Sequence, residues 1–363
     1  MKTSSLRIQD PFDVSSRPRR HRIFAGFTLV EMLVVITIIG ILAALVIPAA
    51  YSVMVAAKRA RIAMEIKQLE MACQAYKEKF GEYPPDFSRV NDFAHATMQD
   101  AARAAVVRHL SKAFPRFVIP GSDITAQWAS LQSTILTGWN IDITLDTCSP
   151  ASALVFWLGG QPLWTGGNNP PTDRTKPVTG FGGFAADPTN PFQSMATCPS
   201  RIGPFYDFST TSVGQLAATS PALANTPVSY WPRDAYGDKT QGCIVYFRAE
   251  NGNYTTDAAT LAADMSNAKY ATVTVNVWPA VDAPVSTISA SGGPYVFVNP
   301  SSIQIFSAGL NVRYSVPGAD STFYPGVTGN VGPYEFPTGR NYQPDTYGNI
   351  TNFSNGTLEA SMK

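Results

Sequence analysis

The chain has 363 residues, of which only 15% are charged, with 27 Gly and 28 Pro and a formal net charge of +1. Few charges and many turn residues argue against a helical bundle and favour a loop-rich globular part that contains β-structure. The first 26 residues carry six cations and two carboxylates, or +4, so the rest of the chain carries −3. This balance argues against a nucleic-acid-binding protein, because such proteins rely on clustered Lys and Arg.

A long apolar run near the start contains no charged residue from Met32 to Ala57. It is long enough to cross a hydrocarbon core of about 30 Å as one helix. Glu31 lies at its upstream edge, where a carboxylate near lipid costs roughly 2.5–3.5 kcal/mol. We therefore expect Glu31 to have a function and a partner.

A basic cluster at 17–22 and the small pair Ala25-Gly26 precede the apolar run. An ordinary secretory signal has its cleavage site after the apolar region, whereas here the small pair comes first. Cleavage after Gly26 would leave the apolar helix on the mature chain and create an α-amine at Phe27. That amine is a candidate cationic partner for Glu31, in the same chain or in a neighbour. The basic cluster predicts a cytoplasmic N-terminus and an exported remainder.

The stretch Gly26-Phe27-Thr28-Leu29-Val30-Glu31, followed by the apolar run, resembles the class III prepilin signal of type IV pilins and type II secretion pseudopilins. The resemblance implies that a membrane-embedded prepilin peptidase cuts after Gly26 and methylates the new N-terminal Phe27. It also implies that Glu31 is the assembly carboxylate and that Pro48 loosens the helix in the fibre. The alternative is a plain signal anchor, which gives no reason for Gly, an aromatic residue and Glu at these positions.

The helical pattern continues beyond the apolar run. Apolar residues recur at alternating steps of four and three and define one face: Ile62, Ile66, Leu69, Cys73, Tyr76 and Phe80. Gly81 and Pro84-Pro85 end the helix, and Glu82 to Pro85 is interpreted as a stiff turn. The predicted helix is roughly 80 Å long. Its half 27–57 is the transmembrane and assembly part, and its amphipathic half 58–80 packs on an exported domain.

The exported globular domain is expected at 81–363, with an insertion-rich part at 91–230 and a sheet with a closing loop at 231–363. Helices are predicted at 91–113, with Phe93, Met98, Ala101, Val106 and Leu110 on one face, at 123–136 and at 149–160. Strands are predicted at 244–248, 295–298 and 302–307. The predicted fold class is therefore α+β. With the resemblance it is the lollipop of a pilin, in which the long helix packs on a domain with an antiparallel sheet and helical and loop insertions.

The four cysteines are Cys73, Cys148, Cys198 and Cys243. An exported location permits disulfides, and the three possible full pairings stay open. Cys148, Cys198 and Cys243 are the disulfide candidates, whereas Cys73 belongs to the apolar helix face. The wide cysteine spacings and the two separate histidines of the first insertion, His95 and His109, do not indicate a metal site.

The C-terminal stretches 306–311 and 347–353 resemble the closing loop of the major pseudopilin of type II secretion, which binds calcium through Asp side chains and backbone carbonyls. By this resemblance the candidate ligands are Leu310, Asn311, Asp345 and Asn349. Asn and Gly stand at positions where that family has acidic residues, and fewer charges mean weaker binding. The alternative is a loop closed by its own hydrogen bonds.

Three functions follow from these features. The first is a structural subunit of a type II secretion pseudopilus or type IV pilus-like fibre. Such a subunit is held in the bacterial inner membrane with a periplasmic domain and is extracted into a periplasmic or extracellular fibre. Its partners would be other pilins in a homo- or hetero-oligomer, the prepilin peptidase, the inner-membrane platform and lipid, with no nucleic acid.

The second function is a minor pilin or binding module whose enlarged domain recognises a secreted substrate or a surface. The third, an anchored enzyme, is not expected, because the chain has no nucleophile elbow and no clustered carboxylates.

Overall fold

A computed structural model describes residues 27–90, 96–139, 145–164, 178–215, 228–230, 232, 242–250, 254, 279–282, 296–310, 314, 335–337 and 348–362. The chain divides into two compact units, Met1–Met54 and Val55–Lys363. Several predicted features lie outside the described residues: the leader with Gly26, the insertion residues Phe93 and His95, and the loop residues Asn311 and Asp345.

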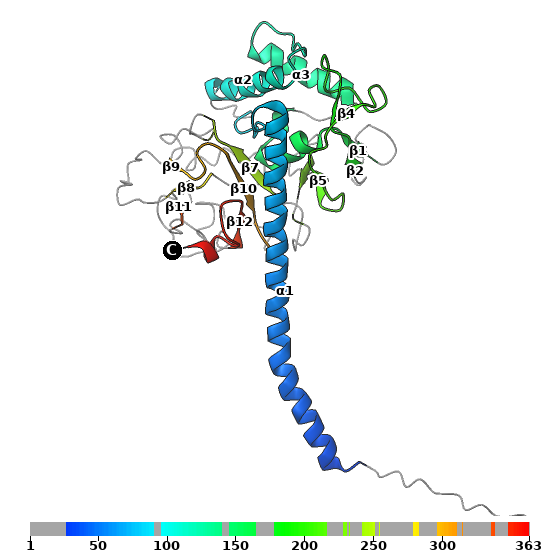
Figure 1. Ribbon diagram of the computed structural model, residues 1–363, viewed down its shortest axis with the longest axis vertical. Coiled ribbons are helices and arrows are strands. Elements are labelled where there is room, and N and C mark those ends of the chain that lie inside the picture. The colour runs from blue at the N-terminus through cyan, green and yellow to red at the C-terminus, as the bar shows by residue number, and fades with distance from the viewer. Residues whose placement is uncertain are drawn as a thin grey trace, which may run out of the picture. The chain divides into compact units, whose positions relative to one another are not determined.

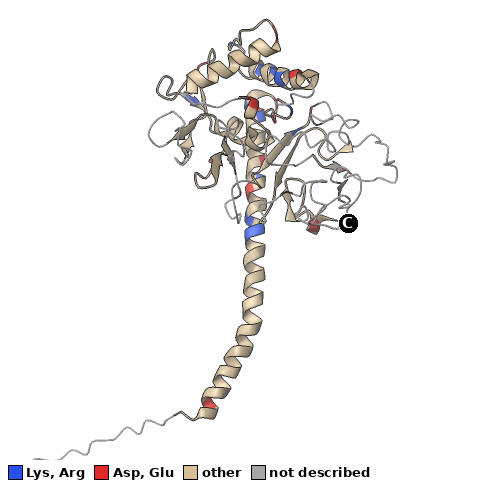
Figure 2. Ribbon diagram, turned by 180° about the vertical axis from the view of Figure 1, so that it is seen from behind, with Lys and Arg blue, Asp and Glu red and all other residues tan. Residues whose placement is uncertain are grey.

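Helix α1 (Leu29–Phe80) carries the apolar run and continues through the amphipathic stretch, as predicted. In the first unit the side chains from Leu29 to Met54 are exposed, Ala43 apart. The sequence has no charged residue between Glu31 and Lys58, and Figure 2 shows a long part of α1 without Lys, Arg, Asp or Glu. The helix is long and apolar enough to cross a membrane. Pro48 lies inside it and has no N–H, so the helix lacks one internal hydrogen bond there.

In the second unit, the predicted apolar face of α1 is the buried face. The six residues of the stripe are each 7% exposed or less: Ile62, Ile66, Leu69, Cys73, Tyr76 and Phe80. Glu65 is buried beside them and accepts a hydrogen bond from the Tyr230 hydroxyl. The stripe therefore anchors the domain to the helix by burial of apolar surface.

A three-stranded antiparallel sheet lies beside this half of α1 (Figure 1). Its order is β12 (Ile350–Thr351), β10 (Ile303–Ser307), β7 (Val245–Arg248), with Ile303 opposite Arg248 and Phe306 opposite Val245. β7 and β10 confirm two of the strands predicted from β-branched and aromatic runs. The third predicted strand is β9 (Val296–Phe297), which is shorter than expected.

The remaining strands form small sheets. β1 (Pro162–Trp164) pairs with β2 (Val178–Phe181), β3 (Phe184–Ala185) with β4 (Arg201–Ile202), and β5 (Val213–Gln215) with β6 (Val228–Tyr230), all antiparallel. β8 (Val281–Asp282) pairs antiparallel with β9 and parallel with β11 (Glu335–Phe336). Two short 3-10 turns are η1 (Leu145–Thr147) and η5 (Glu359–Ser361).

Helices α2 (Ala96–Ala113) and α3 (Ile124–Trp139) lie near the C-terminal end of α1 (Figure 1). The α3 prediction is confirmed, with Asp123 accepting a 2.9 Å hydrogen bond from the Ala126 N–H as an N-cap. The predicted face of α2 is partly wrong, because Ala101 is exposed and Ala102 is buried. The true buried face includes Arg103 and His109, which apolar periodicity does not count.

The predicted helix at 149–160 is present as two parts. α4 (Pro150–Leu154) begins with Pro at its first position, and η2 (Val155–Gly159) continues it as a π-helix. Both parts are buried except for Pro150. In this segment Trp157 stacks on Phe87, with ring centroids 5.4 Å apart.

One hydrophobic core joins these parts. Aromatic side chains from α1, the loop after it, α3, η2 and β3 contact one another, among them Tyr76, Phe87, Trp139, Trp157 and Phe184. The residues predicted as insertions therefore share a core with the spine helix. The fold is α+β: a long apolar N-terminal helix followed by a globular domain of helices and small, mostly antiparallel sheets.

Candidate functional site

Two of the predicted processing and assembly residues, Phe27 and Glu31, lie at the N-terminal end of α1. Phe27 is 71% exposed and Thr28 precedes the first helical residue. The Thr28 hydroxyl accepts a hydrogen bond from the Glu31 N–H at 3.2 Å. In return, the Glu31 carboxylate accepts 2.8 Å hydrogen bonds from the Thr28 N–H and hydroxyl. This reciprocal pair is a capping box.

The capping box supplies Glu31 with a partner that the pattern analysis missed. Threonine followed three residues later by glutamate, just before an apolar run, is its sequence signal. A carboxylate in the first turn is also stabilised by the helix dipole. In the unprocessed chain the Phe27 nitrogen is part of a peptide bond, so its amine as a partner of Glu31 stays a prediction for the processed protein.

The family model described as the prokaryotic N-terminal methylation motif matches residues 22–47. This stretch contains Gly26, Phe27 and Glu31 and leads directly into the apolar part of α1. The chain is a type IV pilin-like protein. Its prepilin signal and apolar helix make it membrane-anchored, and such signals are those of proteins processed by prepilin peptidase and assembled with other pilins.

Neither a curated protein nor a solved structure matches the chain. The similarity of the C-terminal part of this pilin-like protein to the major pseudopilin is therefore still a prediction.

A charge cluster lies at the turn that follows α1, centred on Glu82. The Glu82 carboxylate lies 2.6 Å from His109 Nδ1, 3.2 Å from Lys112 Nζ and 3.4 Å from Arg248 Nη2. These partners come from α2 and β7, so Glu82 joins three separate segments. The hydrogen bond from His109 is the main reason that the pKa of Glu82 falls to about 2. The sequence analysis interpreted this turn only as stiff, and that interpretation was incomplete.

His109 is fully buried between two hydrogen-bond partners. Its Nδ1 faces Glu82 and its Nε2 lies 2.9 Å from the Tyr76 hydroxyl. The network is satisfied when neutral His109 donates from Nδ1 and accepts from Tyr76 at Nε2. Burial lowers the pKa of His109, and the hydrogen bond to Glu82 partly opposes this. His109 of α2 therefore hydrogen-bonds both to α1 and to the turn that follows it.

Asn352 joins the C-terminal segment to α1 by hydrogen bonds. Its side chain accepts a hydrogen bond from the Ile305 N–H at 2.9 Å and donates to the Ile303 carbonyl at 3.2 Å and to Glu70 at 3.1 Å. Lys67 also donates to the Asn352 carbonyl at 2.6 Å. These hydrogen bonds join the C-terminal segment to β10 and α1.

Two of the four predicted calcium ligands, Leu310 and Asn349, lie in the described part of the chain. Leu310 is half-buried and Asn349 is fully buried. The side-chain amide of Asn349 has no hydrogen-bond partner in the described part of the chain. An amide oxygen of this kind is a ligand that calcium accepts. The described residues contain no cluster of three or more His, Cys, Asp or Glu that could hold a metal ion. Calcium binding therefore stays a prediction that depends on Asn311 and Asp345.

The four cysteines are free thiols in this structure, including the disulfide candidates Cys148, Cys198 and Cys243. Cys148 and Cys243 are buried like Cys73, and burial raises their pKa values above the ordinary range. Cys198 is half-buried, and its thiol lies 3.4 Å from the Ser200 carbonyl. Sequence spacing does not show which thiols are close in space, so the sequence could name these candidates but not decide whether any of them pair.

Proposed function

We propose that this pilin-like protein is a structural subunit of a type II secretion pseudopilus or type IV pilus-like fibre. The observation that carries the proposal is the methylation motif at 22–47, with Gly26, Phe27 and Glu31 at the positions of the signal, continuous with α1. The N-terminus is cytoplasmic and the domain periplasmic until the subunit is extracted into a fibre. The role is structural and not catalytic.

Processing and assembly follow from three residues. Prepilin peptidase cuts after Gly26 and leaves a free amine on Phe27. While the subunit is in the membrane, the capping box with Thr28 supplies hydrogen bonds to the Glu31 carboxylate. In the fibre, the Phe27 amine of a neighbouring subunit approaches Glu31 and compensates its charge. An unpaired carboxylate among apolar helices is costly, so this pair sets the register of assembly.

Pro48 contributes to the same step. Because it removes one hydrogen bond from α1, the helix is more easily unwound around this position during packing. The inner-membrane platform of the secretion or pilus machine is the partner that extracts the subunit from lipid.

The test uses two variants of Glu31 in cells that hold the complete machine. Glu31→Leu removes the charge and the acceptor, and Glu31→Gln keeps an acceptor for Thr28 without the charge. Both are expected to be processed normally, with the mature mass beginning at Phe27, and both are expected to lose at least tenfold in sheared fibres. Normal fibres from Glu31→Gln would contradict the charge mechanism. A Gly26→Lys variant, which should retain its leader, controls for processing.

The second candidate is a minor pilin whose domain recognises a secreted substrate or a surface. It is supported by the helices α2 and α3, which enlarge the globular unit beyond its small sheets. Labelling of the protein in isolated fibres separates the candidates. Label along the whole fibre supports the structural subunit, and label at fibre ends alone supports the minor pilin.

A further inference from the structure

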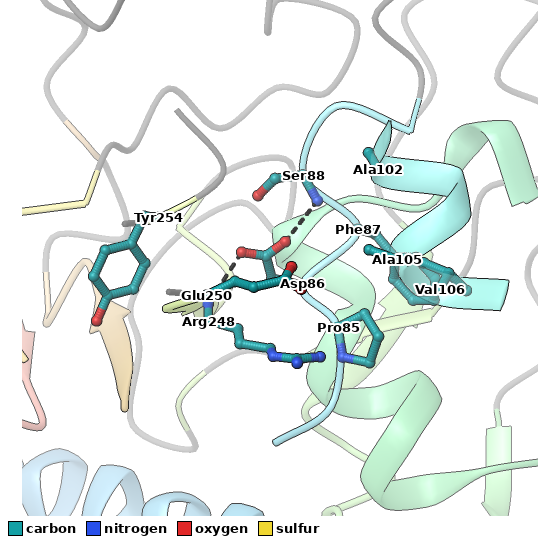
Figure 3. Close-up of a pocket in the computed structure, with 10 residues that line it drawn as sticks. All are labelled: Pro85, Asp86, Phe87, Ser88, Ala102, Ala105, Val106, Arg248, Glu250 and Tyr254. Carbon is teal, nitrogen blue, oxygen red and sulfur yellow. Dashed lines mark hydrogen bonds between the residues drawn. The ribbon is translucent and has the colours of Figure 1, made fainter. Parts of the chain in front are cut away.

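A cavity of about 260 Å³ lies within the globular unit. Its walls come from the loop after α1, from α2, and from the end of β7 with the residues that follow it (Figure 3). Pockets for drug-sized ligands measure roughly 300–1,000 Å³, whereas a water molecule occupies about 30 Å³ in the liquid. The cavity therefore has room for a small organic molecule of about one ring.

The three charged side chains that line the cavity all have partners. Asp86 is 6% exposed, and its carboxylate accepts hydrogen bonds from two backbone N–H groups, at 2.9 and 3.0 Å. The Arg248 guanidinium lies 3.4 Å from Glu82, and Glu250 forms an ion pair with Arg108. An ionic ligand would give up its hydration for groups whose charges are already compensated. The lining therefore favours a ligand without net charge.

Two of these side chains keep hydrogen-bonding capacity for such a ligand. A guanidinium has five N–H donors, and the contact of Arg248 with Glu82 engages only its Nη2. The Glu250 carboxylate has two oxygens, and the ion pair with Arg108 engages only Oε1. A hydroxyl group donates to a carboxylate and accepts from a guanidinium. A ligand with several hydroxyl groups can therefore use both side chains at once.

The side of the cavity formed by α2 is apolar. Ala102, Ala105 and Val106 line it, and Pro85 lies beside them in the lining. The two alanine side chains are short, so a ring has room to lie against the helix. Burial of C–H groups against this wall is favourable. The cavity thus has one apolar side and one side that forms hydrogen bonds.

Tyr254 contributes an aromatic ring to the same lining. Its hydroxyl donates hydrogen bonds to the carbonyls of Val298 and Asn299, at 3.2 and 2.8 Å, and these bonds fix the position of the ring. The ring adds apolar surface against which C–H groups of a ligand can pack.

The loop that carries Asp86 has an uncommon backbone. Phe87 and Arg89 have φ of 58° and 61°, in the left-handed region that non-glycine residues rarely adopt. The Phe87 side chain is held against Trp157, with ring centroids 5.4 Å apart, and against Phe156 at 5.2 Å. The aromatic core therefore holds this wall of the cavity in a conformation that costs energy, a feature often found at binding sites.

We propose that this cavity binds the ring of a neutral sugar. Its hydroxyl groups form hydrogen bonds with Arg248 and Glu250, and its C–H face lies against the alanines of α2. A pyranose ring combines the three properties that the lining selects, because it has no charge, several hydroxyl groups and apolar C–H groups on its faces. This inference goes beyond the proposed function, because a fibre subunit needs no such site.

The test measures binding of the methyl glycosides of glucose, galactose and mannose to the full chain, in micelles of a zwitterionic detergent at neutral pH. The method is ligand-observed saturation-transfer NMR. Glucosamine and glucuronate are the cationic and anionic ligand controls. Cyclohexanol, a ring of the same size with a single hydroxyl group, tests whether several hydroxyl groups are needed.

Three variants locate the binding. Ala105→Leu fills the cavity from α2 without changing any charge. Arg248→Lys keeps a cation beside Glu82 but removes the planar set of N–H donors. Ala101→Leu makes the same change as Ala105→Leu at an exposed position of α2 outside the lining and is the matched control.

We expect at least one methyl glycoside to bind with a dissociation constant of about 1–10 mM, as suits a ligand of this size. Both charged sugars and cyclohexanol should bind at least about fivefold more weakly, because each lacks a property that the lining selects. Binding should weaken at least about fivefold in Ala105→Leu and Arg248→Lys and stay within about twofold in Ala101→Leu.

Four results would each overturn the proposal: no binding of any of the three glycosides, tighter binding of a charged sugar, equal binding of cyclohexanol, or full binding to Ala105→Leu. If Arg248→Lys does not fold, the Ala105→Leu and ligand controls decide it. A disaccharide that ends in the bound sugar then identifies the source. Equal or tighter binding of the disaccharide indicates the end of a glycan chain, and its failure to bind indicates a free monosaccharide.

Discussion

Replacing Glu82 by Gln tests whether the charge cluster at the end of α1 holds the insertion helices in place. The variant keeps an oxygen that can accept the hydrogen bond from His109 Nδ1 but removes the negative charge shared with Lys112 and Arg248. Gln has nearly the same shape as Glu, and the native side chain is only 21% exposed. The effect of the substitution is therefore mainly electrostatic.

The magnitude follows from the pKa of Glu82. Its fall from 4.5 to about 2 corresponds to about 3.4 kcal/mol at 1.36 kcal/mol per unit. Lys112 is 51% exposed and Glu82 itself is partly exposed, so solvent screening reduces this to about half, or about 1.5–2 kcal/mol. A carboxyl group with a lowered pKa stabilises the folded state above its unfolded pKa of 4.5. This contribution is lost as the pH falls from 4.5 through about 2.

The assay is urea unfolding of the full chain in detergent micelles, followed by tryptophan fluorescence, at neutral pH and near pH 3. Glu82→Gln should lower the free energy of unfolding by about 1.5–2 kcal/mol at neutral pH and by less than about 0.5 kcal/mol near pH 3. Glu78→Gln, at an exposed position of α1, is the matched control and should change it by less than about 0.5 kcal/mol. A Glu82→Gln effect that equals that of the control, or that is the same at both pH values, would refute the reasoning.

Two further predictions concern the other contacts of α1. Burial lowers the pKa of His109, so the folded state favours the neutral histidine and should lose stability as the pH falls below 6.5. In His109→Gln the melting temperature should therefore depend less steeply on pH between 7 and 5. An unchanged slope would count against this role of His109. Asn352→Ala leaves the Ile305 N–H without its side-chain acceptor and removes one of two side-chain donors to the Ile303 carbonyl, and it should cost about 1–3 kcal/mol in urea unfolding. Asn355→Ala, at an exposed position, is the control and should lower the free energy of unfolding by less than about 0.5 kcal/mol. Equal losses of stability in the two variants would disprove the role of Asn352.

Much of the helical structure could be predicted because its signals are local. The 4-and-3 spacing from Ile62 to Phe80 is a property of neighbouring turns, and every member of that stripe is buried. The α2 face was predicted in part: Val106 and Leu110 are buried as expected, whereas Ala101 is exposed. Apolar periodicity missed Arg103 and His109, which are buried through partners on other segments. Arg103 pairs with Asp146 at 2.8 Å, and no periodicity of apolar residues contains that information.

The candidate sites divide in the same way. The prepilin signal from Gly26 to Glu31 is a short motif of consecutive residues, so its residues could be named without a structure. The cavity beside α2 could not, because its walls come from three separate segments: the loop at 85–88, the α2 residues Ala102, Ala105 and Val106, and Arg248, Glu250 and Tyr254. Neither Asp86 nor Tyr254 carries a sequence signal that separates it from an ordinary loop residue.

By itself, the sequence determined the membrane helix, its processing signal, its amphipathic continuation and the α+β class, because each depends on residues within a few turns of one another. Only the tertiary structure decided what Glu82, His109 and Asn352 do. Glu82 is paired with a residue 27 positions away on α2, and Asn352 with one 282 positions away on α1. Such pairs depend on how distant segments pack, and packing is settled by the whole core at once.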